Sequence, residues 1–131
     1  MLNKGDLYTQ EFFISDELYS GFIELFNDRN PLHTDETFAQ QKGFKSKVMH
    51  GNILNGFLSY FVGECLPLKN VIIHSQEIKF SKPIFLHDTI TLHAQVKEFF
   101  ESVNALQIAF YFENSDNMKL AKGNIQIGIL Q

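Results

Sequence analysis

The spacing of hydrophobic residues predicts a strand and then a helix at the start of the chain. Apolar and polar residues alternate imperfectly over residues 7–14, as in a half-buried strand. Ser15 follows as a candidate N-cap, and Asp16 and Glu17 lie in the first turn, where the helix dipole stabilises acids. Apolar residues then recur at helical spacing, so we expect a helix that ends near Asn27.

The clearest helical pattern covers residues 52–66. Its apolar residues form a broad stripe along one side, made of Ile53, Leu54, Phe57, Leu58, Phe61, Val62 and Cys65. A shorter helix is predicted over residues 35–41, because Gly43 is a helix-ending signal just beyond it. We expect the stripe of the longer helix to lie at the centre of the core.

The period of the hydrophobic pattern changes to two from Asn70 onward. Alternating residues predict strands within 77–80, 90–97, 106–112 and 125–129, with a break at Lys82-Pro83 and a turn over 114–117. One early strand, then helices, then a run of antiparallel strands is an α+β pattern. In such a fold the sheet wraps around a helix.

Length and composition predict a single globular domain that covers residues 1–131. Fourteen Phe residues and the absence of Trp indicate an interior filled largely by aromatic rings. The net charge of −4 argues against a nucleic-acid partner, and no basic stripe interleaved with aromatic residues is present.

Cysteine usage and hydropathy indicate the compartment. The single cysteine, Cys65, excludes an internal disulfide, and its place among apolar helix positions predicts a buried thiol rather than a nucleophile. The N-terminal residues lack a signal-peptide core, and no stretch approaches the ~18 apolar residues of a membrane span. We therefore expect a soluble, cytoplasmic protein that does not bind a membrane.

The stretch richest in reactive side chains is 26–51, which has little helix or strand pattern where it begins. Asp28 and His33 flank Asn30-Pro31, where a sharp turn is expected, because Pro31 fixes its own φ and disfavours helical backbone at Asn30. Such a turn can aim a carboxylate and an imidazole at one point, where they would hold and activate a water molecule. The amide side chain of Asn30 is expected to shape this turn.

His50 and Gly51 lie at the start of the helix predicted over residues 52–66. Unpaired N–H groups and the positive end of the helix dipole are available there to an oxyanion. Gly51 has no Cβ, so a substrate could approach its backbone closely. We interpret His50 as a positioning residue rather than a second base.

A metal site is conceivable from Asp28, His33, Asp35 and His50, since these include hard and borderline ligands. No tight His-x-His or Cys-x-x-Cys spacing supports it, so no metal is predicted.

Three lysines, Lys42, Lys45 and Lys47, form a basic cluster near the mouth of the expected site. The cluster is either a solvated loop or a region that attracts the phosphates of coenzyme A or of a phosphopantetheine arm. The salt dependence of KM would distinguish these two interpretations.

A joint pattern of residues resembles that of the MaoC-like (R)-specific enoyl-CoA hydratases. It consists of Asp28-Arg29-Asn30-Pro31-Leu32-His33, Ala39, Gly43-Phe44 and then His50-Gly51 ahead of an apolar helix. The resemblance covers essentially the whole chain and implies a hot-dog fold, in which an antiparallel sheet wraps around a long central helix. It also implies a homodimer or a higher homo-oligomer with the active site near the interface, and no cofactor.

The activity that the resemblance implies is the reversible addition of water to a trans-2-enoyl thioester of coenzyme A or acyl carrier protein. Asp28 and His33 would be the catalytic pair that holds the water. Gly51, whose amide would polarise the thioester carbonyl, would bind substrate together with Ser59, Asn30 and His50. Which member of the pair acts as the base stays open, because the two groups are coupled.

The chain departs from the pattern of many relatives in two places. Phe26-Asn27 stands where they have a small hydroxyl residue followed by Gly or an acid, and Ser46-Lys47 stands where they have Arg-Pro. Both differences bear on the shape of the pocket and on the choice of substrate.

Two alternative functions stay open. A hot-dog thioesterase usually places an acid on the central helix facing the thioester, and the only acid on this helix is Glu64, near its far end. A non-catalytic acyl-thioester binder is the second alternative, although a binder does not need the water-activating pair.

Overall fold

The computed structural model describes residues 2–131, which form a five-stranded antiparallel sheet with helices on one side and at one end. The strand order across the sheet is β1-β3-β4-β5-β2. The strands are β1 (Leu7–Phe13), β2 (Val71–Phe80), β3 (Thr89–Phe100), β4 (Ala105–Glu113) and β5 (Lys119–Ile129). The sequence predicted all five, and the turn over residues 114–117 joins β4 to β5 as expected.

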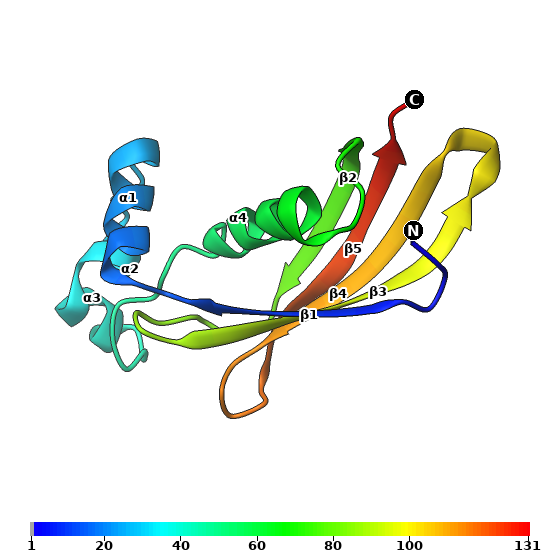
Figure 1. Ribbon diagram of the computed structural model, residues 1–131. Coiled ribbons are helices and arrows are strands. Elements are labelled where there is room, and N and C mark those ends of the chain that lie inside the picture. Colours follow the sequence, from blue (N-terminus) through cyan, green and yellow to red (C-terminus); the bar gives the residue numbers. More distant parts are fainter. Residues whose placement is uncertain (1) are drawn as a thin grey trace.

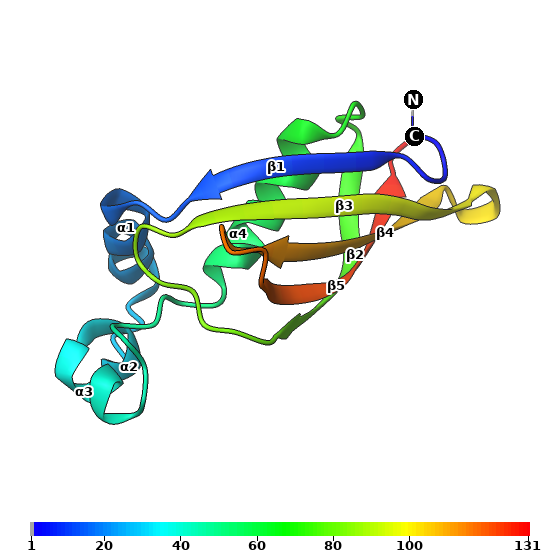
Figure 2. The ribbon, with the colours of Figure 1, turned by 90° about the horizontal axis from the view of Figure 1, so that it is seen from below.

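The sheet curves around α4 (Ile53–Tyr60), which lies on its concave side (Figure 1). The apolar stripe of α4 shares one core with the inward side chains of β3 and β4, whose alternate residues are buried, and with buried residues of β5. This arrangement is the hot-dog fold, and it confirms the α+β prediction. The remaining helices, α1 (Asp16–Phe26), α2 (Pro31–Thr34) and α3 (Glu36–Gln41), gather beyond one end of the sheet, away from the two termini (Figure 2).

Helix α1 begins and ends where the sequence indicates. The Ser15 hydroxyl accepts a hydrogen bond from the amide of Leu18 at 3.1 Å, and Asp16 and Glu17 lie in the first turn. Asn27 ends the helix with a φ of 60°, a left-handed conformation that asparagine tolerates well. The chain therefore turns sharply just before Asp28.

The central helix is less regular than its sequence predicts. The α-helical hydrogen bonding of α4 ends at Tyr60, and Phe61–Cys65 continue as a π-helical turn, η1. Such turns widen the helix by one residue and occur frequently beside functional sites. Apolar periodicity does not reveal this change, because Phe61 and Val62 are buried in either geometry.

The interior is mainly aliphatic, so the expectation of a largely aromatic core is wrong. Four of the fourteen Phe residues are buried: Phe57, Phe61, Phe110 and Phe112. Several others lie on the surface, among them Phe13, Phe26 and Phe80. Composition could not show this distribution, because it gives the number of Phe residues but not whether each side chain points into the core.

Cys65 is half-buried rather than fully buried. Its Sγ atom lies 3.6 Å from Oε1 of Gln10, and burial raises the pKa of the thiol. A raised pKa disfavours the reactive thiolate, which agrees with the prediction that Cys65 is not a nucleophile. Within residues 2–131, no helix is long and apolar enough to cross a membrane.

Candidate active site

The turn predicted at Asn30-Pro31 is present, and Asn30 shapes it. Asn30 has extended backbone (φ −51°, ψ 134°), and its side-chain oxygen accepts from the amide of Leu32 at 2.9 Å, capping α2. Pro31 occupies the first position of this short helix, where its missing N–H costs nothing. The Asp28 carboxylate in turn accepts from the amide of Asn30 at 3.2 Å. Asn30 therefore acts within the turn itself.

This turn brings His33 to Asp28. Nε2 of His33 lies 3.8 Å from Oδ2 of Asp28, and the two side chains are 17% and 50% exposed. Nδ1 of His33 is 2.7 Å from the carbonyl oxygen of Val48, and a carbonyl can only accept, so we assign the proton to Nδ1. A neutral His33 then presents its unprotonated Nε2 toward the carboxylate, and the pair offers two acceptors at one place.

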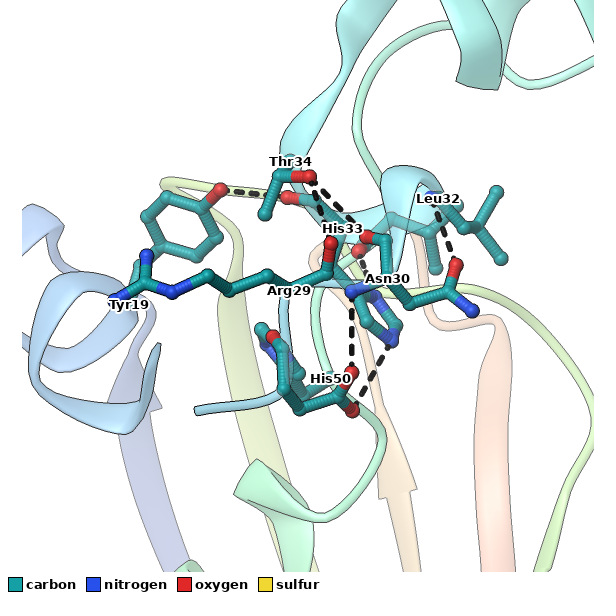
Figure 3. A network of polar contacts seen from close by, with 9 residues as sticks. Tyr19, Arg29, Asn30, Leu32, His33, Thr34 and His50 are labelled. Carbon is teal, nitrogen blue, oxygen red and sulfur yellow. Dashed lines mark hydrogen bonds and ion pairs between the residues drawn. The ribbon is translucent and has the colours of Figure 1, made fainter. Parts of the chain in front are cut away.

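Backbone contacts fix His33 from several sides. The amide of Val48 donates to the carbonyl of Leu32 at 3.0 Å, so Val48 binds both the backbone of Leu32 and the imidazole of His33. The Tyr19 hydroxyl donates to the carbonyl of His33 at 2.5 Å, which ties α1 to α2 (Figure 3). Neither Tyr19 nor Val48 was expected to support the site, since sequence spacing does not show contacts between segments this far apart.

His50 is buried (2% exposed) and lies against His33. The ring centroids of the two imidazoles are 3.9 Å apart, and Phe22 packs on the other side at 4.6 Å. Nε2 of His50 donates to the backbone carbonyl of Asp28 at 2.9 Å. Its Nδ1 atom is buried and has no hydrogen-bond partner among residues 2–131.

Gly51 lies between His50 and the first residue of α4, as predicted. Neither its amide N–H nor that of Asn52 donates to any atom of the described residues, so both are available to a ligand. A Cβ atom on Gly51 would lie 3.1 Å from Cε1 of Phe80. The missing side chain thus makes room for the Phe80 ring as well as for any close approach of a substrate.

A cavity of about 790 Å³ opens beside these residues, and we call it the site cavity. Asp28, His33, His50 and Gly51 all line it. Its apolar wall comes from two helices and consists of Leu18, Phe22, Phe26, Ile53 and Phe57. Ser59, in contrast, is exposed on α4 and does not line the cavity of this single chain.

Three of the four candidate metal ligands also converge. One ligand atom from each of Asp28, His33 and His50 lies within 4.8 Å of the others, whereas Asp35 instead caps α3 by accepting from the amide of Phe38. Groups of this kind also occur in proteins without a metal ion, so the convergence alone does not identify a metal site. The absence of a metal therefore stays a prediction.

Each lysine of the basic cluster lies over an aromatic ring. The ammonium groups of Lys42, Lys45 and Lys47 are 5.3, 4.5 and 4.9 Å from the ring centroids of Phe38, Phe85 and Tyr19. None of the three lines the site cavity. Arg29 extends away from His33 toward α1 (Figure 3).

Comparisons with known proteins show which proteins this chain is similar to. An (R)-specific enoyl-CoA hydratase of Rhodospirillum rubrum is 39% identical over 70 residues, which are 53% of this chain and 49% of the relative. An enzyme of the same name from Aeromonas caviae is 35% identical over 77 residues, 59% of this chain and 58% of the relative. The chain thus matches about half the length of these curated relatives.

The solved structure of the (R)-hydratase of A. caviae involved in PHA biosynthesis has a TM-score of 0.90 to this chain. The match covers 98% of this chain and 97% of that one at 24% identity, a likeness that shows the fold. The family model described as the MaoC like domain matches residues 10–109. Since this match covers most of the sequence and includes every residue of the turn and of the α4 N-terminus, the chain belongs to the MaoC-like family.

Proposed function

We propose that this protein is an (R)-specific enoyl thioester hydratase that also works in reverse as a 3-hydroxyacyl thioester dehydratase. The observation that carries the proposal is the Asp28–His33 pair, two acceptors 3.8 Å apart on the wall of an apolar cavity, next to the unpaired amide of Gly51. The hydratase names of the relatives support the reaction class and its stereochemistry.

The pair is suited to hold a nucleophilic water. Two acceptors 3.8 Å apart can each receive a hydrogen bond of about 2.8 Å from the same water, one from each of its protons. The water oxygen then keeps its lone pairs free and directed away from the protein. The bond from Nδ1 to Val48 selects, for neutral His33, the tautomer whose Nε2 carries no proton, so Nε2 can act as an acceptor here.

Hydration begins when the oxygen of this water forms a bond to C3 of the enoyl group and the C2=C3 π bond breaks. One water proton passes to the Asp28/His33 pair, and the electron pair moves through C2 onto the thioester oxygen. The Asp28/His33 pair then returns a proton to C2, and the thioester carbonyl re-forms. A hydroxyl group is thereby added at C3 and a hydrogen at C2. General acid–base catalysis of this kind contributes about 10²–10⁴-fold to the reaction rate.

The charge that develops on the thioester oxygen needs a donor. The Gly51 amide lies at the N-terminus of α4, where the helix dipole also favours negative charge. Loss of one such donor costs about 2.7–4 kcal/mol of transition-state stabilisation in other enzymes. We assign this role to the Gly51 amide. We place the acyl chain against the apolar wall of the site cavity.

The structure gives less support to the alternatives. Glu64, the acid that a thioesterase would need, lies in η1 with its side chain 66% exposed and paired to Lys69 at 3.7 Å. It does not line the site cavity. A non-catalytic binder would not require the Asp28–His33 arrangement. A homodimer and a cytoplasmic location remain part of the proposal and rest on the family resemblance and the hydropathy of the sequence.

The experiment that tests the reaction class is incubation of the protein with crotonyl-CoA. Loss of the enoyl-thioester absorbance without release of free thiol is the expected result for a hydratase. Thiol release would indicate a thioesterase instead. Binding of crotonyl-CoA with neither change would indicate a binder.

A further inference from the structure

Part of the wall of the site cavity is polar. Asn52 and Asn55, at the start of α4, line the cavity, whereas α1 contributes apolar side chains to it. Nδ2 of Asn55 donates to Oδ1 of Asn52 at 2.8 Å. Oδ1 of Asn55 accepts from Nε2 of Gln76 on β2 at 2.5 Å. The Asn55 amide is therefore held in one orientation from both of its ends.

Gln76 reaches Asn55 because β2 contains a bulge. Ile73 packs against the core from the first part of β2 and Ile78 from the second part, although strict alternation would turn Ile78 outward. The pairing of β2 with β5 shifts its register between Ile73 and Ser75, and the extra residue reverses the alternation. Gln76 therefore faces α4 instead of the outer side of the sheet. Bulges re-aim side chains in this way beside many active sites.

The Asn55 amide keeps hydrogen-bonding capacity for a ligand. An amide side chain has two N–H donors and two acceptor lone pairs, and Asn52 and Gln76 use one of each. The remaining donor and acceptor match a hydroxyl group, which donates and accepts at the same time. No Lys or Arg lines the cavity among the described residues, so a carboxylate would have no cation there.

Asn55 lies one helical turn beyond Gly51, whose amide we assign to the thioester oxygen. A turn advances about 5.4 Å, and a chain whose carbon–carbon bonds are about 1.5 Å long covers this distance in about four or five bonds. The cavity continues along α4 to Phe57. Beside Asn55, no atom lies within 4 Å of the Cβ position of Gly56, so space is open there. An oxygen on C5 or C6 of the acyl group would thus reach the Asn55 amide.

We propose that Asn55 determines substrate specificity, and that the preferred substrates are enoyl thioesters whose acyl chain carries a hydroxyl group on C5 or C6. Gln76 is the positioning residue for the Asn55 amide. This proposal rests on the function proposed above, since it places the thioester carbonyl at Gly51. A plain alkyl chain would cover the remaining donor and acceptor of Asn55 and leave them unpaired, which costs free energy that a hydroxyl group does not.

A second copy of the chain is the competing occupant of this wall. Asn52 and Gly56 are exposed, and β2 is an edge strand of the sheet. A contact between copies could therefore use the same amides. The substrate is favoured because Asn55 lines the same cavity as Asp28 and His33.

The test compares 6-hydroxy-trans-2-hexenoyl-CoA with trans-2-heptenoyl-CoA, which has a methyl group in place of the hydroxyl. The wild type is expected to show a kcat/KM about 3- to 10-fold higher for the hydroxyl substrate, the factor that one net hydrogen bond provides. Asn55→Leu keeps the side-chain size approximately and removes the amide, so the methyl substrate should then be preferred. The ratio between the two substrates is the readout, because a general loss of folding or activity would lower both values together.

Gln76→Leu should give a ratio between those of the wild type and Asn55→Leu, since the Asn55 amide stays but is no longer oriented. Gln126→Leu is its matched control: Gln126 lies on the neighbouring strand β5, 3.4 Å from Nδ1 of His74, and outside the cavity. Asn124→Leu is the control for Asn55→Leu, because Asn124 is exposed on β5 and lines a different depression. Both controls should keep the wild-type ratio.

Two results would overturn the proposal: a wild type that does not prefer the hydroxyl substrate, or an Asn55→Leu variant that keeps the wild-type ratio. If Asn55→Leu keeps the ratio and instead changes the sedimentation coefficient, the amides serve a contact between copies. If the wild type hydrates crotonyl-CoA and both longer thioesters without preference, the hydratase function stands and the assignment of Asn55 fails. If it hydrates none of the three, the proposed function fails and the assignment fails with it.

Discussion

Nε2 of His50 donates a 2.9 Å hydrogen bond to the backbone carbonyl of Asp28, 22 residues earlier in the chain. The bond joins the residue that precedes Gly51 to the residue that carries the proposed water-binding carboxylate. Because His50 is also packed between His33 and Phe22, one buried ring holds both members of the proposed catalytic pair in place. Its function would be that of a positioning residue.

Substitution of His50 by Asn should lower kcat about tenfold, whereas His50→Gln should retain most of the activity. The side-chain nitrogen of Gln can reach the place of Nε2, and that of Asn cannot, so only Gln can donate to the Asp28 carbonyl. A tenfold loss corresponds to about 1.4 kcal/mol, within the range for one hydrogen bond. Steady-state kinetics with crotonyl-CoA check this, with thermal unfolding of both variants as the control. Equal activity of the two variants would contradict the positioning role.

Gly51→Ala should lower kcat about tenfold with little loss of stability. The new Cβ would lie 3.1 Å from the Phe80 ring, which is 51% exposed and can move aside, so the free energy of unfolding should fall by less than about 1 kcal/mol. Displacement of the Gly51 amide would remove part of the roughly 2.7–4 kcal/mol by which one oxyanion donor stabilises the transition state. Gly63→Ala is the control, because no atom lies within 4 Å of its Cβ position. An unchanged kcat for Gly51→Ala would show that the Gly51 amide does not stabilise the transition state.

Phe26→Ala should raise KM for a longer enoyl chain, such as trans-2-octenoyl-CoA, several-fold and leave KM for crotonyl-CoA nearly unchanged. Phe26 lines the site cavity yet is 69% exposed, so it can contact an acyl chain without contributing much to the core. Loss of contact with one methylene is worth about 0.8 kcal/mol, or roughly fourfold. The neighbouring Leu25→Ala is the control, since Leu25 is 76% exposed and lies outside the cavity. Identical chain-length profiles for the two variants would place the acyl chain elsewhere.

Cys65 should react slowly with a thiol reagent at pH 8 in the folded protein and rapidly after denaturation. Burial raises the pKa of its thiol, so the thiolate fraction at this pH is smaller than that of a free cysteine. The rates of reaction with a chromogenic disulfide, before and after addition of denaturant, measure this difference. A native rate as fast as the denatured one would show that the thiol is activated rather than protected.

Local patterns predicted the elements whose signals are contained in short stretches. The Ser15 cap, the end of α1 near Asn27 and the turn at Asn30-Pro31 all lie where the sequence indicates, because each depends on local residue preferences. The alternating strands were equally visible, since burial on one face of a sheet repeats with period two.

Features that depend on contacts between distant segments were not predicted. The supports of His33 come from Tyr19 on α1 and from Val48, and the partner of His50 is the carbonyl of Asp28. The π-helical turn η1 leaves the apolar stripe unchanged, so its sequence looks like ordinary helix. Ser59, included on the basis of the resemblance, is exposed on α4, and its role remains a prediction.

The most direct test of the central claim is the hydration rate of crotonyl-CoA by the wild type, Asp28→Asn and His33→Gln, followed through the enoyl-thioester absorbance. Both variants keep the side-chain size approximately but replace a basic group by an amide, which cannot take the proton of the water, so each should lose about 10²–10⁴-fold in kcat while it unfolds at the wild-type temperature. An active wild type together with a folded variant that retains full activity would contradict the account, because the water would then be held by other groups.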